Sequence, residues 1–314
     1  MVLDFNMLHN VLEATKYWLA LGSIRSIGSR KIKKLVEKFG SPEAVFSASV
    51  IDISSQLKDF TLASEIVQVG KELARFEMII NQTLRSGIDV ICPDSLEYPH
   101  LLKYIKDPPA ILYKKGVMLN SSEITVAIVG TRFPSEDGAR FAKKMAQELA
   151  RKNVTVVSGL AKGIDTSAHI GALNAKGKTI GVLGSGLNMI YPQENIQLSQ
   201  KICGKGAILS ECYPDETVSK GKLIQRNRIT SGISRGVILV EPERGAKNTA
   251  NWASKQKRPI FKFDPKDKTE TLTFSENYLI IKDINDIDLV LDKLKSVEIF
   301  SLSTDYNSDQ AYLF

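Results

Sequence analysis

The chain has 314 residues and a formal net charge of +7; 43% of its residues are hydrophobic and 25% are charged. This is the composition of an ordinary globular protein, long enough for a substantial core and for more than one domain. No apolar run approaches the ~20 residues that a membrane-spanning helix needs, and the N-terminus lacks a signal-peptide pattern, so we expect a cytoplasmic protein without a membrane partner.

Cysteines and histidines are few and scattered. They are Cys92, Cys203, Cys212, His9, His100 and His169. The cysteines are odd in number and have no CxxC spacing, which disfavours structural zinc and a disulfide framework. We therefore expect no metal site and no cofactor.

Residues 1–85 lack strand patterning and are expected to form a small helical domain. Within 23–40, a turn at Gly28 leads into an amphipathic helix rich in lysine and arginine. This arrangement resembles one half of a helix-hairpin-helix (or SAM-like) DNA-binding element, in which backbone N–H groups meet a phosphate. A purely structural helical hairpin fits equally well. Ser41 and Pro42 are suited to cap and start the next helix, and a longer helix is predicted over about 62–85.

Residues 86–118 are predicted to be a connector with an edge element. Gly87 ends the preceding helix, and Ile88–Ile91 is a short strand pattern. The consecutive prolines of Asp107-Pro108-Pro109 forbid regular structure on the way to Gly116.

Residues 119–297 carry the pattern of a doubly wound α/β domain. Six short apolar runs, rich in β-branched residues, are separated by stretches of helical length such as 135–152, 167–176 and 193–204. The runs are 126–129, 154–157, 180–183, 207–209, 237–240 and 260–263. Runs of this kind are typical of strands buried on both faces of a parallel sheet, and the alternation predicts helices on both faces.

The residues that follow these strands are the candidates for binding. Ligands of doubly wound sheets bind at the carboxyl ends of the strands, where glycines and helix N-termini accept phosphates. The loops lack a G-x-G-x-x-G in the usual place and a G-x-x-x-x-G-K-[ST] motif, which disfavours ordinary dinucleotide and P-loop chemistry. The candidate phosphate-binding residues are Gly130, Thr131, Arg132, Ser158, Gly159, Lys162, Gly163, Gly184, Ser185, Gly186, Gly245 and Lys247.

Positive charge is concentrated between Lys220 and Arg258. Ten lysines and arginines stand there against two glutamates, a net +8, which leaves about −1 for the rest of the chain. Such an excess indicates a polyanionic partner, although basic residues also coat solvated faces. Arg226-Asn227-Arg228, placed just before a predicted short helix ending near Ser234, suits phosphate or base contacts; two arginines in structural salt bridges are the alternative.

Several motifs together resemble the DprA/Smf family of DNA-processing proteins, from the helical N-terminal region to about residue 263. They are the sequence Ser158–Leu173, the stretch Gly184–Pro192 with Glu194-Asn195, the segment 226–234, Tyr98-Pro99, the run 107–113 followed by Gly116, and Gly130-Thr131-Arg132.

The resemblance implies an extended Rossmann-like domain that binds single-stranded DNA. It also implies a homodimer that protects incoming DNA and helps to load a RecA-type recombinase during natural transformation. On this reading Arg132, Lys162 and the Arg226–Arg228 triplet carry the DNA backbone, His169 is structural, and no residue is catalytic.

The chain departs from the family pattern at Arg244–Lys247, where Ser-Gly-Ser-Leu is usual, and at Phe263-Asp264, where Pro-Gly is usual. We also expect it to lack the C-terminal winged helix that many members carry. An alternative function is a nucleotide sensor, or a phosphoribohydrolase-like enzyme. Hydrolysis is disfavoured because the stretch 248–250 has no carboxylate, and Glu211 and Glu241 are expected to pair with nearby arginines.

After a predicted helix at 286–296, residues 298–314 are expected to form a flexible polar tail. Its last residues, Gln310–Phe314, resemble the short motif by which bacterial proteins bind the replication sliding clamp. There Leu313 and Phe314 would fill an apolar pocket while Gln310 fixes the register. The alternative is that these residues cover the protein's own core.

Overall fold

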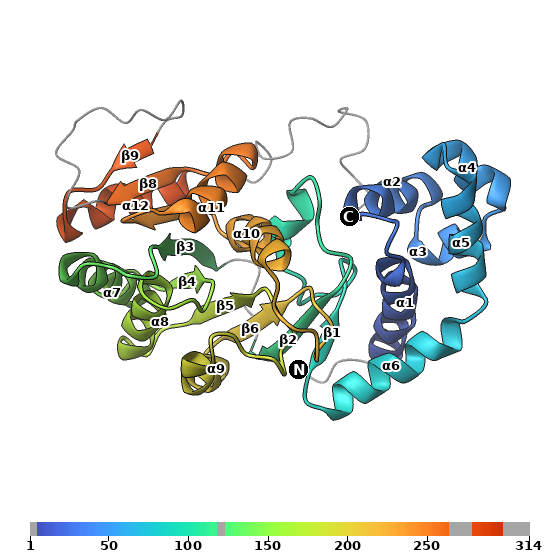
Figure 1. The fold of residues 1–314 in the computed structure, drawn as a ribbon, viewed down its shortest axis with the longest axis horizontal. Coiled ribbons are helices and arrows are strands. Elements are labelled where there is room, and N and C mark those ends of the chain that lie inside the picture. The colour runs from blue at the N-terminus through green and yellow to red at the C-terminus, as the bar shows by residue number, and fades with distance from the viewer. Residues whose placement is uncertain (1–4, 118–122, 264–277, 298–314) are drawn as a thin grey trace.

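The computed structural model describes residues 5–117, 123–263 and 278–297. A group of helices from the N-terminal part of the chain lies at one end of the molecule, and a large sheet with helices on its faces lies at the other (Figure 1). Within the described residues, no helix is both long and apolar enough to cross a membrane.

The N-terminal part is helical, as the sequence predicted. Its helices are α1 (Phe5–Ser23), α2 (Ser29–Phe39), α3 (Pro42–Ser47), α4 (Val50–Leu57), α5 (Phe60–Gly70) and α6 (Leu73–Arg85). The side chain of Ser41 caps α3 by accepting a hydrogen bond from Ala44 N at 3.0 Å. The single helix predicted over 62–85 is instead two helices, because α5 ends at Gly70, a residue of low helix propensity, and a turn follows.

The sheet has nine strands in the described residues, in the order β1-β2-β6-β5-β4-β3-β7-β8-β9. The strands are β1 (Asp89–Ile91), β2 (Leu112–Gly116), β3 (Ile124–Gly130), β4 (Val154–Ser158), β5 (Thr179–Leu183), β6 (Ala207–Ser210), β7 (Gly236–Val240), β8 (Ile260–Phe263) and β9 (Tyr278–Ile280). All six predicted strands are present. From β6 to β9 neighbouring strands are parallel, whereas β1 and β2 extend the sheet as an antiparallel edge.

Helices cover both faces of this sheet. They are α7 (Glu136–Arg151), α8 (Ile164–Asn174), α9 (Ile196–Cys203), α10 (Lys220–Ile233), α11 (Arg244–Lys255) and α12 (Ile287–Lys295). Along β3, Val126 and Ile128 pack in one core cluster with α7, α8 and α12, while Ala127 and Val129 pack in another with α11. This alternation is the consequence of successive side chains pointing to opposite faces of a strand. The predicted fold, a doubly wound α/β sheet with a helical N-terminal region, is confirmed.

The order of the strands reverses beside β3. The strands β4, β5 and β6 lie successively on one side of it, and the chain then crosses through α10 to place β7 on the other. Helix α10 begins at Lys220, so the triplet 226–228 lies inside it and not before a shorter helix as predicted. The side chain of Ser219 caps the first turn by accepting from Lys222 N at 3.3 Å.

Candidate functional site

The loops after β3, β4 and β7 meet at the carboxyl edge of the sheet. Gly130, the last residue of β3, is paired in register with Val240, the last residue of β7. The loop after β4 approaches the loop after β3 at Gly163. Gly163 has φ +77°, and any side chain there would clash, because its Cβ would lie 2.5 Å from Thr131 O. Ile164 N, at the start of α8, donates to the same carbonyl at 3.2 Å. The loops that the sequence predicted to come together are therefore in direct contact.

The loop 158–163 is closed by a carboxylate of its own chain. Asp165 Oδ2 accepts hydrogen bonds from Gly159 N at 3.1 Å and from Ala161 N at 3.2 Å. Burial raises the pKa of Asp165, and the nearby Arg226 opposes that effect. The Ser158 hydroxyl is buried and donates to Ile128 O at 2.6 Å. These backbone N–H groups, expected to face a phosphate, are satisfied by Asp165.

Arg226 lies inside the protein and joins the loop after β4 to β5. Its side chain is buried, with 8% of the residue exposed. The guanidinium donates to Gly159 O at 2.7 Å and to Val182 O, and it fills the space where a side chain at position 159 would stand. Burial lowers the pKa of Arg226, and Asp165 opposes the shift. The sequence placed Arg226 on the DNA backbone, whereas the structure uses it to hold a loop.

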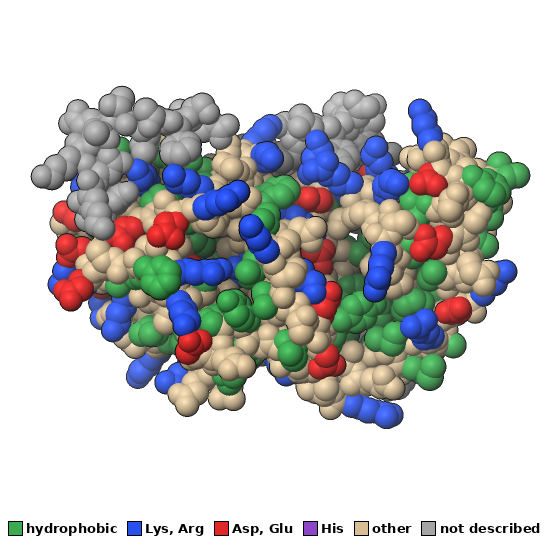
Figure 2. Space-filling view, viewed as in Figure 1, with side chains coloured by type: hydrophobic (Ala, Val, Ile, Leu, Met, Phe, Trp, Pro, Cys, Tyr) green, Lys and Arg blue, Asp and Glu red, His purple; other side chains and the backbone are tan. Residues whose placement is uncertain are grey.

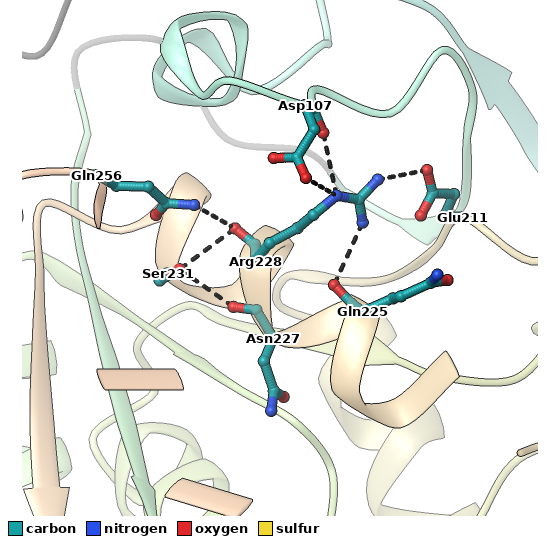
Figure 3. A network of polar contacts seen from close by, with 7 residues as sticks. All are labelled: Asp107, Glu211, Gln225, Asn227, Arg228, Ser231 and Gln256. Atoms are coloured by element: carbon teal, nitrogen blue, oxygen red, sulfur yellow. Dashed lines mark hydrogen bonds and ion pairs between the residues drawn. The ribbon is translucent and has the colours of Figure 1, made fainter. Parts of the chain in front are cut away.

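Arg228 is the centre of a second polar network, shown in Figure 3. It is 5% exposed and donates to Glu211 Oε1 at 2.6 Å and to Asp107 O at 3.0 Å. Burial opposes ionisation, but Glu211 and Asp107 together raise the pKa of Arg228. The backbone carbonyl of Arg228 accepts from Gln256 Nε2 at 3.0 Å. The expected pairing of Glu211 with an arginine is thus confirmed, and the alternative of structural salt bridges holds for Arg228.

Asn227 lies between the two arginines and reaches toward α11. Its side-chain oxygen accepts from Arg226 Nε at 3.2 Å, and its Nδ2 donates to Asn248 Oδ1 at 3.2 Å. Asn227 therefore connects α10 to the first turns of the helix that follows β7.

Glu241 does not follow the expectation of an arginine partner. Its carboxylate accepts from Ser135 N at 2.8 Å and from the Ser135 hydroxyl. Ser135 in turn caps α7 through Gly138 N at 3.1 Å. Glu241 thus places a negative charge at the N-terminus of α7, where the helix dipole favours an anion.

The loop after β5 is covered. Gly184, Ser185 and Gly186 are all buried. Gly184 lies against Leu223 of α10, and Gly186 N donates to Glu216 O at 2.7 Å. These three residues are therefore packed beneath the edge and are not accessible to a ligand on its surface.

Four of the remaining predicted residues are exposed at this edge, whereas Thr131 is buried and Gly130 and Gly163 are half-buried. Arg132, Lys162, Gly245 and Lys247 are solvent-accessible, and Lys162 forms an ion pair with Glu194. Hydrogen bonding with Lys162 lowers the pKa of Glu194. Figure 2 shows basic side chains gathered over α10, α11 and the loops beside them. Exposed Arg244 and Phe133 belong to the same loops but were not among the predicted site residues; their positions directly beside Gly245 and Arg132 were the available signal.

The other sequence candidates lie away from the edge or outside the described residues. His169 is fully buried, its Nδ1 lies 2.7 Å from Thr179 Oγ1, and burial lowers its pKa to about 3. In the described part of the chain, no three residues of the His, Cys, Asp and Glu types are placed to share a metal ion. The predicted clamp-binding residues Gln310, Leu313 and Phe314 lie outside the described residues.

Known proteins resemble this chain in both sequence and structure. Protein Smf of Synechocystis is 36% identical over 253 residues, which are 78% of this chain but 63% of that protein. DNA processing protein DprA of Bacillus subtilis is 40% identical over 218 residues, 67% of this chain and 72% of that protein.

Two solved structures extend the comparison. The crystal structure of DprA from Streptococcus pneumoniae matches with a TM-score of 0.71 and 28% identity, covering 87% of this chain and 95% of that one. DNA processing protein A from Helicobacter pylori, whose structure is described in terms of its single-stranded DNA binding mode, matches with a TM-score of 0.51 and 28% identity over 70% of this chain and 97% of that one.

The family model of DNA recombination-mediator protein A matches residues 89–288, more than half of the chain. That segment contains β1, the whole parallel sheet and the loops described above. The chain therefore belongs to the DprA/Smf family of DNA-processing proteins, as its motifs predicted.

Proposed function

We propose that the chain binds single-stranded DNA across the carboxyl edge of its sheet. The observation that carries the proposal is the group of exposed cations on the loops after β3 and β4 and on the first turn of α11. The exposed side chains of Arg132, Arg244 and Lys247 are basic, whereas the carboxylates of Asp165 and Glu241 are turned inward onto backbone N–H groups. A strand of DNA lying across the edge would meet these cations without meeting Asp165 and Glu241, while the exposed carboxylates beside it are those of Glu194, paired with Lys162, and Glu243.

Within this proposal the predicted phosphate-binding residues divide into two groups. Arg132, Lys162, Lys247 and the backbone of Gly245 are exposed and suited to contact phosphates. The buried residues of the triplet 226–228, with the glycines and serines of the covered loops, position those groups.

The same observations disfavour a nucleotide-binding function. The N-terminus of α7 holds Glu241, and the N–H groups of Gly159 and Ala161 hold Asp165. A mononucleotide phosphate at either place would have to displace a carboxylate of like charge. Glu211 is engaged with Arg228. We therefore propose that the protein acts by binding DNA, without a catalytic residue or cofactor.

We further propose that the protein acts in the cytoplasm as a homodimer, protects incoming DNA and helps to load a RecA-type recombinase during recombination. Membership of the family supports this role. The departure at Arg244–Lys247 lies at the proposed DNA-binding edge, Phe263 ends the neighbouring strand β8, and Asp264 lies outside the described residues. Loading therefore has to be tested with this chain itself. The test is recombinase filament formation on DNA coated with a single-strand-binding protein, with and without this chain.

DNA binding is tested by fluorescence anisotropy of labelled oligo-dT at increasing salt. If Arg132, Lys162, Arg244 and Lys247 each neutralise one phosphate, the slope of log K against log salt is about −3. Arg132→Ala should weaken binding and reduce the slope by about 0.7. Arg85→Ala, an exposed arginine at the end of α6, is the matched control and should bind normally.

Calorimetry separates the two candidate functions. Heat on titration with oligo-dT but not with mononucleotides supports DNA binding. Salt-independent binding of oligo-dT, or saturable binding of mononucleotides alone, would contradict the proposal.

A further inference from the structure

Phe133 is the most exposed large hydrophobic side chain in the described part of the chain, with 83% of the residue accessible. It follows β3 directly, in the loop that begins with Gly130. Its backbone N donates to Thr131 Oγ1 at 3.1 Å, and Pro134 restricts the backbone on its other side. These two features restrict the backbone on both sides of Phe133, while its aromatic ring lies outside the core.

The ring belongs to the basic edge. Arg132 precedes it, and the carbonyl of Arg132 lies against Gly163, the residue next to Lys162. Lys162 in turn forms an ion pair with Glu194, which follows β5. The chain thus places an exposed aromatic beside two exposed cations on contacting loops. Hydrophobic and basic side chains lie side by side in this region of the surface (Figure 2).

We propose that Phe133 is a stacking platform for a base of single-stranded DNA, and that it gives the site its preference for single strands over duplex. This inference rests on the proposed function and adds to it. Cations bind the phosphates of either form, but a free base face is offered only by an unpaired strand. An exposed ring of this size has apolar surface to bury, and stacking on a base removes it from water.

The test compares Phe133→Ala with the wild-type chain on three labelled ligands: oligo-dT, an abasic oligomer of the same length, and duplex DNA. Phe133→Ala should weaken oligo-dT binding by about 5- to 150-fold, since the stacking of one base on an aromatic ring is lost. Binding to the abasic oligomer and to duplex should not change. Phe133→Tyr should restore oligo-dT binding. Phe60→Ala, an exposed phenylalanine at the start of α5, is the matched control.

A direct readout comes from Phe133→Trp. Its fluorescence should be quenched by oligo-dT beyond any change in the wild-type chain, which has tryptophan at 18 and 252, and should not be quenched by the abasic oligomer.

The outcomes separate the two proposals. If Arg132→Ala weakens oligo-dT binding and Phe133→Ala does not, stacking is refuted and DNA binding stands. If Phe133→Ala weakens oligo-dT and abasic binding equally, its role is structural and stacking is again refuted. If the wild-type chain does not bind oligo-dT, both proposals fail.

Discussion

Replacement of Arg228 by methionine should destabilise the fold and leave the DNA-binding edge intact. The guanidinium is buried and bonded to Glu211 and Asp107, and methionine fills a similar volume without the charge. Breaking a buried ion pair from one side costs about 3–5 kcal/mol, because the partner charges stay uncompensated. Glu211 is one-third exposed and can recover water, so we expect the lower end, about 3 kcal/mol.

Urea denaturation of Arg228→Met and Arg132→Met measures this difference. Arg132 is exposed, so its replacement should change the free energy of unfolding by less than about 0.5 kcal/mol. Oligo-dT affinity should show the opposite order: Arg132→Met loses affinity, whereas folded Arg228→Met binds within about twofold of the wild-type chain. Adding Glu211→Gln to Arg228→Met should recover part of the lost stability, because one unpaired charge is removed.

A stable Arg228→Met chain that no longer binds oligo-dT would refute this reasoning. That result would place the guanidinium of Arg228 on the DNA, as the sequence pattern alone suggests, and would require the Glu211 pair to open on binding.

Three further predictions follow from single side chains. Glu194→Gln releases Lys162 from a surface ion pair and should tighten oligo-dT binding by no more than about fivefold; an unchanged dissociation constant in anisotropy would contradict this. Glu241→Ala removes the carboxylate from the N-terminus of α7 and should lower the free energy of unfolding by about 1 kcal/mol in urea denaturation. An unchanged free energy of unfolding would show that this carboxylate does not stabilise the helix. Burial lowers the pKa of His169 to about 3 from an ordinary 6.5, so the unfolded chain binds more protons between these values and stability falls as pH drops below 6.5, by about 1.4 kcal/mol per pH unit. His169→Gln should lack that component when denaturation is compared at pH 7 and pH 5.5.

The sequence predicted the sheet well because its strands are buried on both faces. Runs such as Val126–Val129 and Val237–Val240 are apolar throughout and rich in β-branched residues, so length and composition identify them. Helix α10, in contrast, was predicted too short because its buried residues are largely polar. Residues Arg226–Ile233 are buried although five of the eight are polar, so the helix shows no apolar stripe that a periodicity argument could detect.

The place where the loops meet was predictable, but the direction of their side chains was not. Glycines and cations after parallel strands must gather at one edge, which the contacts of Gly163 and Gly130 bear out. An Arg-Asn-Arg triplet, however, has the same sequence whether its arginines face solvent or carboxylates. Arg228 faces inward because it contacts Glu211 and Asp107. Asp107 is 121 residues away in the chain, and only the fold brings the two together.

If the edge binds DNA as proposed, the buried carboxylates give a reason why it would favour a polymer over a small phosphate compound. Asp165 already satisfies the N–H groups of its loop, and Glu241 already satisfies the N-terminus of α7. Arg226 lies close enough to Asp165 to affect its pKa, and Arg228 is paired with Glu211, so each of these two buried arginines has a carboxylate near it. A single phosphate at either of these two places would have to displace a carboxylate. The exposed cations are spread over separate loops, and only a ligand that carries several phosphates can engage them together.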